Sequence, residues 1–314
     1  MTAGWQDNET KASNRLLNRR NYAMKKYAPI AAVGLLLSCA PMPERGAPVS
    51  RLFDNPQRVT IVGYDDHAME PFLTRDGRYL LFNNLNVPSV NTDLHFAERV
   101  DALTFRHRGP LAGVNTPALE GVASVDRTGT LYFVSPRAYE SMLSTLYRGR
   151  FSDGVVTGVE LVPGVSRREP GIVNFDVEVS PDGDTLYFVD ARFGRGGPET
   201  ADIVIAERRG AGFVRRPDSA SIMKNVNTGA LEYAPCISAD GLMLLFTRGR
   251  LALGGSASIF VSTRSRATEP FGPPARLVAL DGFVEAPTLS PDERAIYYHR
   301  RDGAKHVIYR ASRH

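Results

Sequence analysis

One segment of about thirteen residues occurs five times along this chain of 314 residues, and this repetition constrains the fold more than any other feature. Successive copies begin roughly 50 to 58 residues apart, and each ends in an apolar stretch with an aromatic residue. The copies are residues 70–82, 120–133, 176–188, 234–246 and 286–298.

In four copies an aspartate precedes the terminal aromatic residue by six positions, and a Ser or Thr stands two residues before that aspartate. These aspartates are Asp76, Asp182, Asp240 and Asp292. Such a motif predicts a tight turn between two strands, because the aspartate bonds its own backbone and the glycine that usually follows accepts a positive φ. Glu293 replaces that glycine in the fifth copy, and the second copy has an altered turn.

Two further strand patterns follow each copy, so that each unit is predicted to hold four short antiparallel strands. The third strand is clearest at residues 93–99, 202–208, 258–264 and 307–313, and the fourth at 274–280. Four strands in a unit of about fifty residues are typical of a propeller blade. We therefore predict an all-β fold, a five-bladed β-propeller, over residues 56–314.

The two ends of the repeat region predict how the ring closes. The fifth unit stops after its third strand at His314, whereas an unmatched strand, Gln57–Val62, precedes the first unit. Pairing these two would complete the last blade and protect the sheet edges that an open stack, the alternative arrangement, would expose. Residues 138–147 predict at most one helical turn within a loop.

The N-terminal residues have the pattern of an export signal. Lys25 and Lys26 precede an apolar run over residues 27–37, and Ser38 and Cys39 follow it. A short basic region, an apolar core and a small residue are typical of a signal peptide, and this run is shorter than the roughly 20 residues that span a bilayer. We interpret 1–38 as a signal peptide, with Met24 as an alternative start, and 39–55 as a flexible tether.

Residues Leu36–Cys39 resemble the lipobox of bacterial lipoproteins. The resemblance implies a lipid on Cys39 that attaches the mature chain to a membrane. Ala40 in the next position implies the outer membrane of a cell envelope, with the protein facing the periplasm or the cell surface. An ordinary signal peptide with a chance cysteine is the alternative. Cys236, the other cysteine, lies in an apolar strand pattern and is interpreted as a buried side chain.

Charge and motifs exclude several function classes. The formal net charge of +4 resides entirely in residues 1–38, so the mature chain carries none and lacks the basic surface that nucleic-acid binding needs. The sequence has no phosphate-binding glycine loop, no Cys/His cluster and no serine-nucleophile motif. We expect no cofactor, no metal and a monomer.

Residues 181–208 combine an S-P-D-G turn, an L-Y-F strand, an Arg/Gly-rich loop and a D-I-V strand, in that order. Residues 115–120 and 227–232 share the pattern N-T-x-x-x-E before the next unit. Both features resemble the TolB-like, WD-type propeller repeat of bacterial envelope proteins. The resemblance covers residues 57–314 and implies the propeller fold and a partner that is another envelope protein or a cell-wall component.

Acidic residues occur near the start of each innermost strand, and mostly arginines follow the second strand, which returns to the same face. The acids are Glu70, Glu120, Asp176, Glu232 and Glu285, and the residues opposite are Asn83, Asn84, Arg137, Arg192, Arg248 and Arg300. Two interpretations remain open. These groups either form ion pairs that hold the ring together, or they line a polar funnel for a sugar or peptide.

The first unit departs most from the repeat, which makes its polar residues better candidates for function. The predicted ligand-binding residues are Asp65, Asp66, His67, Glu70, Asn83, Asn84, Arg137, Arg192, Arg248 and Arg300. Their pattern favours a non-enzymatic binding or scaffold module of the cell envelope. The alternative is a carbohydrate-active enzyme, which needs two carboxyl groups roughly 5 to 10 Å apart. Its candidate carboxyl groups are Glu70, Asp176 and Glu232.

Overall fold

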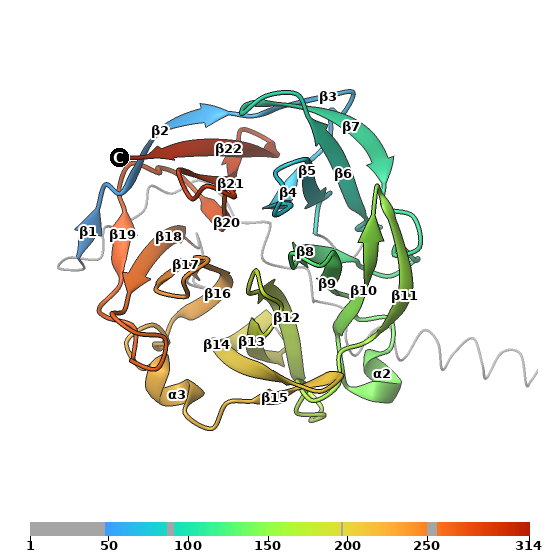
Figure 1. Cartoon of the computed structure of the whole chain (residues 1–314), viewed down its shortest axis with the longest axis vertical. Coiled ribbons are helices and arrows are strands. Elements are labelled where there is room, and N and C mark those ends of the chain that lie inside the picture. Colours follow the sequence, from blue (N-terminus) through green and yellow to red (C-terminus); the bar gives the residue numbers. More distant parts are fainter. Residues whose placement is uncertain (1–47, 87–90, 196, 250–255) are drawn as a thin grey trace, which may run out of the picture.

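The computed structural model describes residues 48–86, 91–195, 197–249 and 256–314, and these form an all-β protein with strands in four sheets. Figure 1 shows the sheets arranged around a central axis, with β4, β8, β12, β16 and β20 innermost. The described residues contain two single helical turns, α2 (Tyr139–Met142) and α3 (Ser219–Ile222). The first of them lies in the loop where at most one turn was predicted.

Each repeat copy supplies the two inner strands of a run of four antiparallel strands. The first run is β4 (Met69–Leu73), β5 (Tyr79–Asn83), β6 (Leu94–Arg99) and β7 (Thr104–Pro110). The second is β8 (Gly121–Val125), β9 (Thr130–Val134), β10 (Leu146–Ser152) and β11 (Val155–Leu161). The third is β12 (Ile172–Val179), β13 (Thr185–Gly194), β14 (Gly197–Arg209) and β15 (Gly212–Arg215).

The fourth run is β16 (Leu231–Ile237), β17 (Met243–Gly249), β18 (Ala257–Thr263) and β19 (Ala275–Leu277). The fifth is β20 (Val284–Leu289), β21 (Ala295–Asp302), β22 (Lys305–Arg313) and β2 (Phe53–Arg58). The third and fourth runs share one sheet because β14 and β16 pair at Ala201 and Leu231, and β1 (Val49–Ser50) adds to it beside β19. The strand β3 (Thr60–Val62) pairs with β7 in the first.

The repeated turn has the chemistry that its sequence predicts. Thr74 Oγ1 donates to Asp76 Oδ1 at 2.6 Å, and Asp76 Oδ1 also accepts from the Arg78 amide at 3.0 Å. The aspartates of the third, fourth and fifth copies make the same two bonds. Glu293 takes the turn position with φ of 55° without being glycine, and its carboxylate accepts from the Ala239 amide of the preceding unit at 2.5 Å.

A β-bulge interrupts every innermost strand at the same position of the repeat. The pairing register shifts there in all five, and the bulged residue has a positive φ. These residues are Glu70 (51°), Val122 (56°), Asp176 (53°), Ala234 (48°) and Ala286 (53°). A bulge bends its strand and redirects the side chain, so the bulges set what faces the axis at this level.

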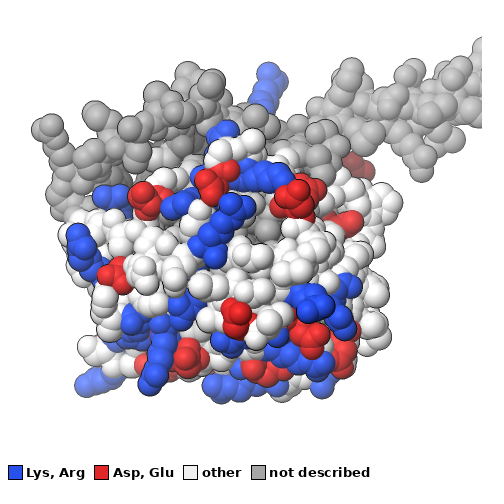
Figure 2. Space-filling model, turned by 90° about the horizontal axis from the view of Figure 1, so that it is seen from above, with Lys and Arg blue, Asp and Glu red and all other residues white. Residues whose placement is uncertain are grey.

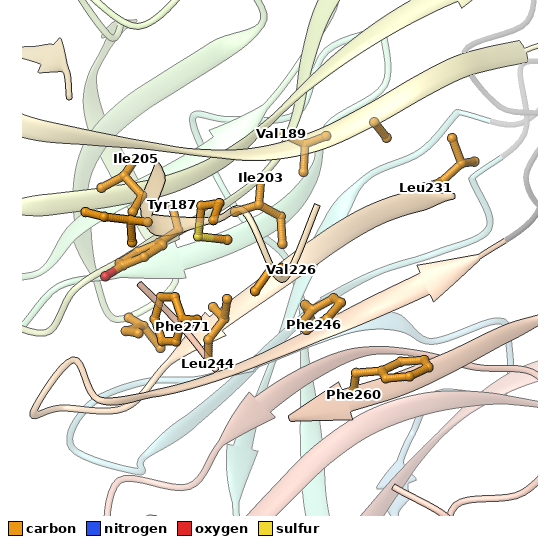
Figure 3. Packing of buried hydrophobic residues seen from close by; sticks show 14 of the residues in the cluster. Tyr187, Val189, Ile203, Ile205, Val226, Leu231, Leu244, Phe246, Phe260 and Phe271 are labelled. Carbon is orange, nitrogen blue, oxygen red and sulfur yellow. The ribbon is translucent and has the colours of Figure 1, made fainter. Parts of the chain in front are cut away.

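The hydrophobic core lies between neighbouring sheets in five clusters. Figure 3 shows the cluster between the third and fourth units, where Tyr187 and Ile203 meet Leu244 and Phe246. All six residues of β20 are buried, whereas exposed residues interrupt the outer strand β11. Inner strands are therefore covered on both faces, which explains why the repeat copies read as continuous apolar runs.

The strand that pairs with the end of the chain differs from the prediction. The residues that pair with β22 belong to β2, Phe53–Arg58, and not to one strand over 57–62. Val59 is 3 % exposed, and its backbone amide donates to the carbonyl of Ile308. The backbone amide of the next residue, Thr60, donates to the carbonyl of Leu103. The chain therefore passes from the last unit to the first at Val59, and β3 joins β7 instead.

Part of the predicted tether, residues 39–55, is ordered. Val49 and Ser50 pair with β19, and β2 begins at Phe53 with a fully buried side chain. Strand pairing and side-chain burial stabilise these short segments, although the surrounding sequence, rich in Pro and Arg, is typical of a flexible tether. The signal segment 1–38, Cys39 and the rest of the tether up to residue 47 lie outside the described residues. Within the described ranges, no helix has the length and apolar character to cross a membrane.

The contribution of β2 can be tested at Phe53, which packs into the cluster between the fourth and fifth units. We expect Phe53→Ala to lower the free energy of unfolding by about 3 to 5 kcal/mol, because it leaves a cavity in a closed core. Val49→Ala, at a side chain that is 64 % exposed, should change it by no more than about 0.5 kcal/mol. Urea unfolding of both variants measures the difference, and equal effects would contradict the role of β2.

Candidate functional site

A cavity of about 100 Å³ lies where the innermost strands converge on the axis. Three carboxyl groups line it, Glu70 from β4, Asp176 from β12 and Glu285 from β20. Tyr233 from β16 and His299 from β21 complete its polar wall. The remaining lining residues are mostly apolar and include Phe175 and Phe193, and no Lys or Arg from the part of the chain that the structure describes is among them.

The five predicted acids do not form one ring. When the copies are aligned on the turn, Glu70 and Asp176 occupy the bulge, where the other three copies have Val122, Ala234 and Ala286. Glu285 stands one residue before the bulge, and Glu120 and Glu232 stand two residues before it. Grouping the five acids by charge alone did not distinguish the three positions that they occupy in the repeat. The axial carboxyl groups are therefore particular to certain units.

Glu120 and Glu232 hold the loops that enter their strands. Both are fully buried, and each accepts hydrogen bonds from the backbone amide and the hydroxyl group of a threonine four residues earlier, Thr116 or Thr228, at 2.6 to 2.9 Å. Glu120 also accepts from Ser135 at 2.7 Å. This geometry explains the repeated N-T-x-x-x-E pattern. It assigns Glu232 to a structural site and not to the axial cavity.

The polar residues that line the axial cavity on β4, β16, β20 and β21 are linked in series by hydrogen bonds. The Glu70 amide donates to His299 Nδ1 at 3.1 Å, and His299 Nε2 lies 3.0 Å from Glu285 Oε2. The Tyr233 hydroxyl donates to the other oxygen of Glu285, and Asn86 donates to Glu70 Oε1 at 2.8 Å. Glu285 thus has two partners, and the ring of His299 is fixed between two strands.

Asp176 and Glu70 are less completely paired. Asp176 is 4 % exposed and accepts one bond, from the Ala234 amide at 2.8 Å. Glu70 Oε2 is buried and has no partner among the described residues. Burial raises the pKa of Asp176 well above its usual range, and the nearby charge of Glu70 raises it further. Burial also raises the pKa of Glu70. No Lys or Arg of the described ranges lines the cavity to stabilise these charges, and His299 only partly offsets the rise in the pKa of Glu70.

Most of the irregular first-unit residues lie away from this cavity. Asp65 pairs with exposed Lys305 at 2.8 Å, and Asp66 accepts from the His67 amide at 2.7 Å. His67 Nδ1 lies 3.3 Å from Nδ1 of His306. None of these residues lines the axial cavity. Of the group that sequence reasoning placed together, Glu70 alone reaches it.

Asn83 and Asn84 support the cavity without lining it. Asn83 donates to Asn86 Oδ1 at 2.9 Å and accepts from the Val122 amide at 3.2 Å, which links the first and second units. Asn84 accepts from the Asp93 amide at 2.8 Å. Asn83 therefore positions Asn86, which bonds Glu70.

Three of the four predicted arginines hold loops or strands. Arg248 donates to Glu232 at 2.7 Å, and Arg137 donates to the Val114 carbonyl at 3.1 Å. Arg300 bonds the Tyr309 hydroxyl at 2.5 Å. Arg192 is exposed, and its side chain makes no hydrogen bond or ion pair within the described ranges; it lines a separate hollow of about 360 Å³ with Asp190. None of the four lines the axial cavity.

A buried ion pair joins three units on the turn side of the bulges. Arg75, from the turn between β4 and β5, donates to Glu178 at 3.0 Å and to the backbone carbonyls of Val125 and Val179. Glu178 also accepts from Ser124 at 2.7 Å. The second copy has Arg127 at the position of Arg75, whereas no other copy has an acid at the position of Glu178. This cross-link connects the first three units on the turn side of Asp176.

Sequence reasoning did not identify Tyr233, Asn86, Arg75 or His299 as part of the site. Tyr233 stands one residue before the bulge, where the copies have Met69, Gly121, Phe175, Tyr233 and Glu285. This variation at a position directed by the bulge is a signal that alignment on the turn could have found. Elsewhere on the surface, Figure 2 shows acidic and basic side chains interspersed over the visible face.

The structural role of Arg248 can be tested directly. We expect Arg248→Ala to lower the free energy of unfolding by about 3 to 5 kcal/mol, because it leaves the buried Glu232 carboxylate without its cation. Arg148→Ala serves as the control, because its partner Glu160 is largely exposed, and should cost no more than about 1 kcal/mol. Thermal or urea unfolding measures both; a negligible effect at Arg248 would restore it as a candidate ligand-binding residue.

No protein-family model matches the chain, and no curated protein matches it. Many solved structures do. An endo-arabinase from Bacteroides thetaiotaomicron is similar with a TM-score of 0.51 at 12% identity, over 82% of this chain and 98% of the other. An exo-β-1,3-galactanase from Phanerochaete chrysosporium has a TM-score of 0.50 at 12% identity, over 82% and 63%.

TolB from Acinetobacter baumannii is similar at 16% identity, with a TM-score of 0.44, over 79% of this chain. The chain spans about half the length of that TolB, 54%. The similarities to the endo-arabinase and the exo-β-1,3-galactanase, each at 12% identity, establish the fold alone. Together with the radial sheets, they show that the chain folds as a β-propeller.

Proposed function

We propose that this chain is a non-enzymatic lipoprotein of the cell envelope that binds a protein or a cell-wall glycan at one mouth of a closed, five-bladed ring. The observation that carries the proposal is the axial cavity, in which Asp176 and Glu70 keep unfilled hydrogen-bonding capacity. The predicted arginines, in contrast, do not line it. Binding is therefore assigned to the axis and not to a ring of ion pairs.

Contacts between strands support five closed blades. The innermost strands contact one another in the order β4, β8, β12, β16 and β20, and β20 in turn contacts β4. The pairing of β2 with β22 supplies the fourth strand of the last run. That pairing covers the edge of β22, which would otherwise be open to another chain.

The envelope location and the lipid anchor rest on the sequence of residues 24–40. The signal pattern and Cys39 support export and acylation. An anchored propeller would present its axial mouth to large envelope components. This arrangement is consistent with a binding module that acts while attached to a membrane.

A carbohydrate-active enzyme is the second candidate. It is favoured by the presence of Glu70 and Asp176 in one cavity, and two similar structures are those of an endo-arabinase and an exo-β-1,3-galactanase. A glycosidase, however, needs one carboxyl group held protonated and another held ionised. Here burial raises the pKa of both. The third candidate carboxyl group, Glu232, is bound to Arg248. Binding therefore ranks first.

A panel of cell-wall glycan fragments and envelope proteins tests both candidates. We expect wild type to bind at least one component without converting it, and Asp176→Asn to weaken that binding about tenfold or more, because a buried carboxylate contact is lost. Glu140→Gln removes an exposed carboxylate outside the cavity and should leave binding unchanged. Calorimetry and product analysis give the readouts. Turnover that disappears in Glu70→Gln or Asp176→Asn would establish the enzyme instead.

The anchor has a separate test. Mass spectrometry of the protein extracted from membranes should show a mature chain that begins at Cys39 with a diacylglyceryl adduct. Cys39→Ser should abolish the adduct and release the protein from the membrane fraction, because the lipid on Cys39 is the membrane anchor in this proposal. A mature chain with a different first residue and no lipid would contradict it.

A further inference from the structure

The axial cavity has a strong charge asymmetry. Three carboxyl groups line it, from Glu70, Asp176 and Glu285, together with the imidazole of His299. No lysine or arginine of the described ranges is among its lining residues. Elsewhere in the described protein, the buried carboxylates of Glu178 and Glu232 are each paired with an arginine, and that of Glu120 is bonded by Thr116 and Ser135. Asp176 and Glu70 differ from these three because they keep unfilled hydrogen-bonding capacity.

The cavity also retains acceptor capacity. Asp176 receives one hydrogen bond through Oδ2, and Glu70 Oε2 is buried and receives none within the described ranges. A buried carboxylate oxygen without a partner is costly. A donor that carries positive charge would gain charge-assisted hydrogen bonds from both groups at once. The occupant that fits this wall best is a cation with several N–H donors.

Size and aromatic lining narrow the occupant further. The volume of about 100 Å³ is well below the roughly 300 to 1,000 Å³ of typical small-molecule pockets, so the cavity takes one substituent of a larger ligand. Phe175 lies between Phe193 and Tyr233, with ring centroids 6.1 and 6.2 Å away. Aromatic rings near carboxylates favour a cation that has an attached hydrocarbon stem.

The arrangement of the carboxyl and imidazole groups in the cavity favours an ammonium group over a bare metal ion. No group of three or more His, Cys, Asp or Glu side chains among the described residues is arranged to hold a metal ion. An ammonium group needs no such convergent set, because its three N–H donors can reach separate acceptors. The separate positions of Asp176, Glu70 and Glu285 on three strands suit it.

We propose that the axial cavity binds the protonated primary amine of a ligand, an alkylammonium group that donates to Asp176 and Glu70 and packs against the Phe175 and Tyr233 rings. This inference rests on the proposed binding function and specifies its chemistry. A lysine side chain of a protein and the amino group of an amino sugar share that chemistry. The experiment below separates the two sources.

Proton release gives the proposal a distinctive signature. Burial raises the pKa of Asp176 and of Glu70, and a bound cation would lower the pKa of both, so its binding should release protons. The groups that face Asp176 are Glu70, Glu285, Tyr233 and His299. Affinity should therefore rise with pH as the carboxyl groups ionise. It should fall again only when the amine itself loses its proton, near pH 10.

Calorimetric titration of the full chain in detergent with n-butylammonium chloride tests the proposal, and n-butanol is the neutral control. We expect one site for the amine and an affinity that rises about tenfold or more from pH 5 to pH 8. Proton release should appear as a measured binding enthalpy that differs between buffers of different ionisation enthalpy. The neutral alcohol should bind at least tenfold more weakly. Equal binding of the alcohol, or affinity that is independent of pH, would overturn the proposal.

Two variants locate the site. Asp176→Asn should weaken n-butylammonium binding about tenfold or more, whereas Glu140→Gln should leave it unchanged. Asparagine tolerates the positive φ of this position and can still accept from the Ala234 amide, so the variant should fold, as its unfolding curve will show. Unchanged affinity in Asp176→Asn would place any bound amine outside the cavity and refute the assignment.

Two further probes identify the source of the amine, and the outcomes keep the two proposals apart. Tighter binding of Nα-acetyl-lysine amide indicates a protein ligand, and tighter binding of glucosamine indicates an amino sugar. If a neutral envelope ligand binds in an Asp176-dependent manner and n-butylammonium does not, the binding function stands and the amine proposal fails. If n-butylammonium binds in the cavity and no envelope component does, the proposed function fails and the amine site stands.

Discussion

A bulge in each innermost strand is the constraint on which the rest of this structure depends. Five buried strands meet at an axis, and each adopts a left-handed conformation at one residue, even where that residue is Val122. Such a conformation is unfavourable for a β-branched residue, so the surrounding sheets must enforce it. Because the bulge redirects one side chain per unit, it determines which residues reach the axial cavity.

The repeated and the unrepeated polar residues have different tasks. The repeated Ser/Thr-x-Asp turns and the two N-T-x-x-x-E loops bond backbone amides of their own turns and loops. Glu178, an acid that no other copy has at its position, links the first three units through Arg75. Asp176 and Glu70 also break the repeat, but no Lys or Arg of the described ranges lines their cavity. Departure from the repeat therefore marks both a structural cross-link and the candidate site, and pairing with an arginine distinguishes them.

The axial carboxyl groups are held in place by their neighbours. His299 is fixed between the Glu70 amide and Glu285, and Asn83 holds Asn86 against Glu70. Such support restricts the cavity to one geometry, which would lower the entropy lost in the proposed binding. Burying Asp176 and Glu70 costs free energy that the compact sheets around them offset, and the proposed cation would recover part of that cost.

The sequence by itself determined the all-β propeller repeat and the turn chemistry, because both depend on residues close together in the chain. Thr74 and Asp76, for example, bond as their spacing predicts. It also indicated that Glu70 and Asp176 lie near the axis. It placed the strand that pairs with β22 a few residues late, because the bend at Val59 depends on contacts with Ile308 and Leu103.

Only the tertiary structure decided which polar groups are paired. Glu232 and Asp176 look alike in the sequence, since each precedes a repeat copy or begins one. In the fold, Glu232 meets Arg248, while Asp176 lines a cavity together with two other carboxyl groups. The difference arises because a bulge changes side-chain direction at a single residue. A displacement of two positions along a strand therefore separates a structural ion pair from a carboxyl group of the candidate site.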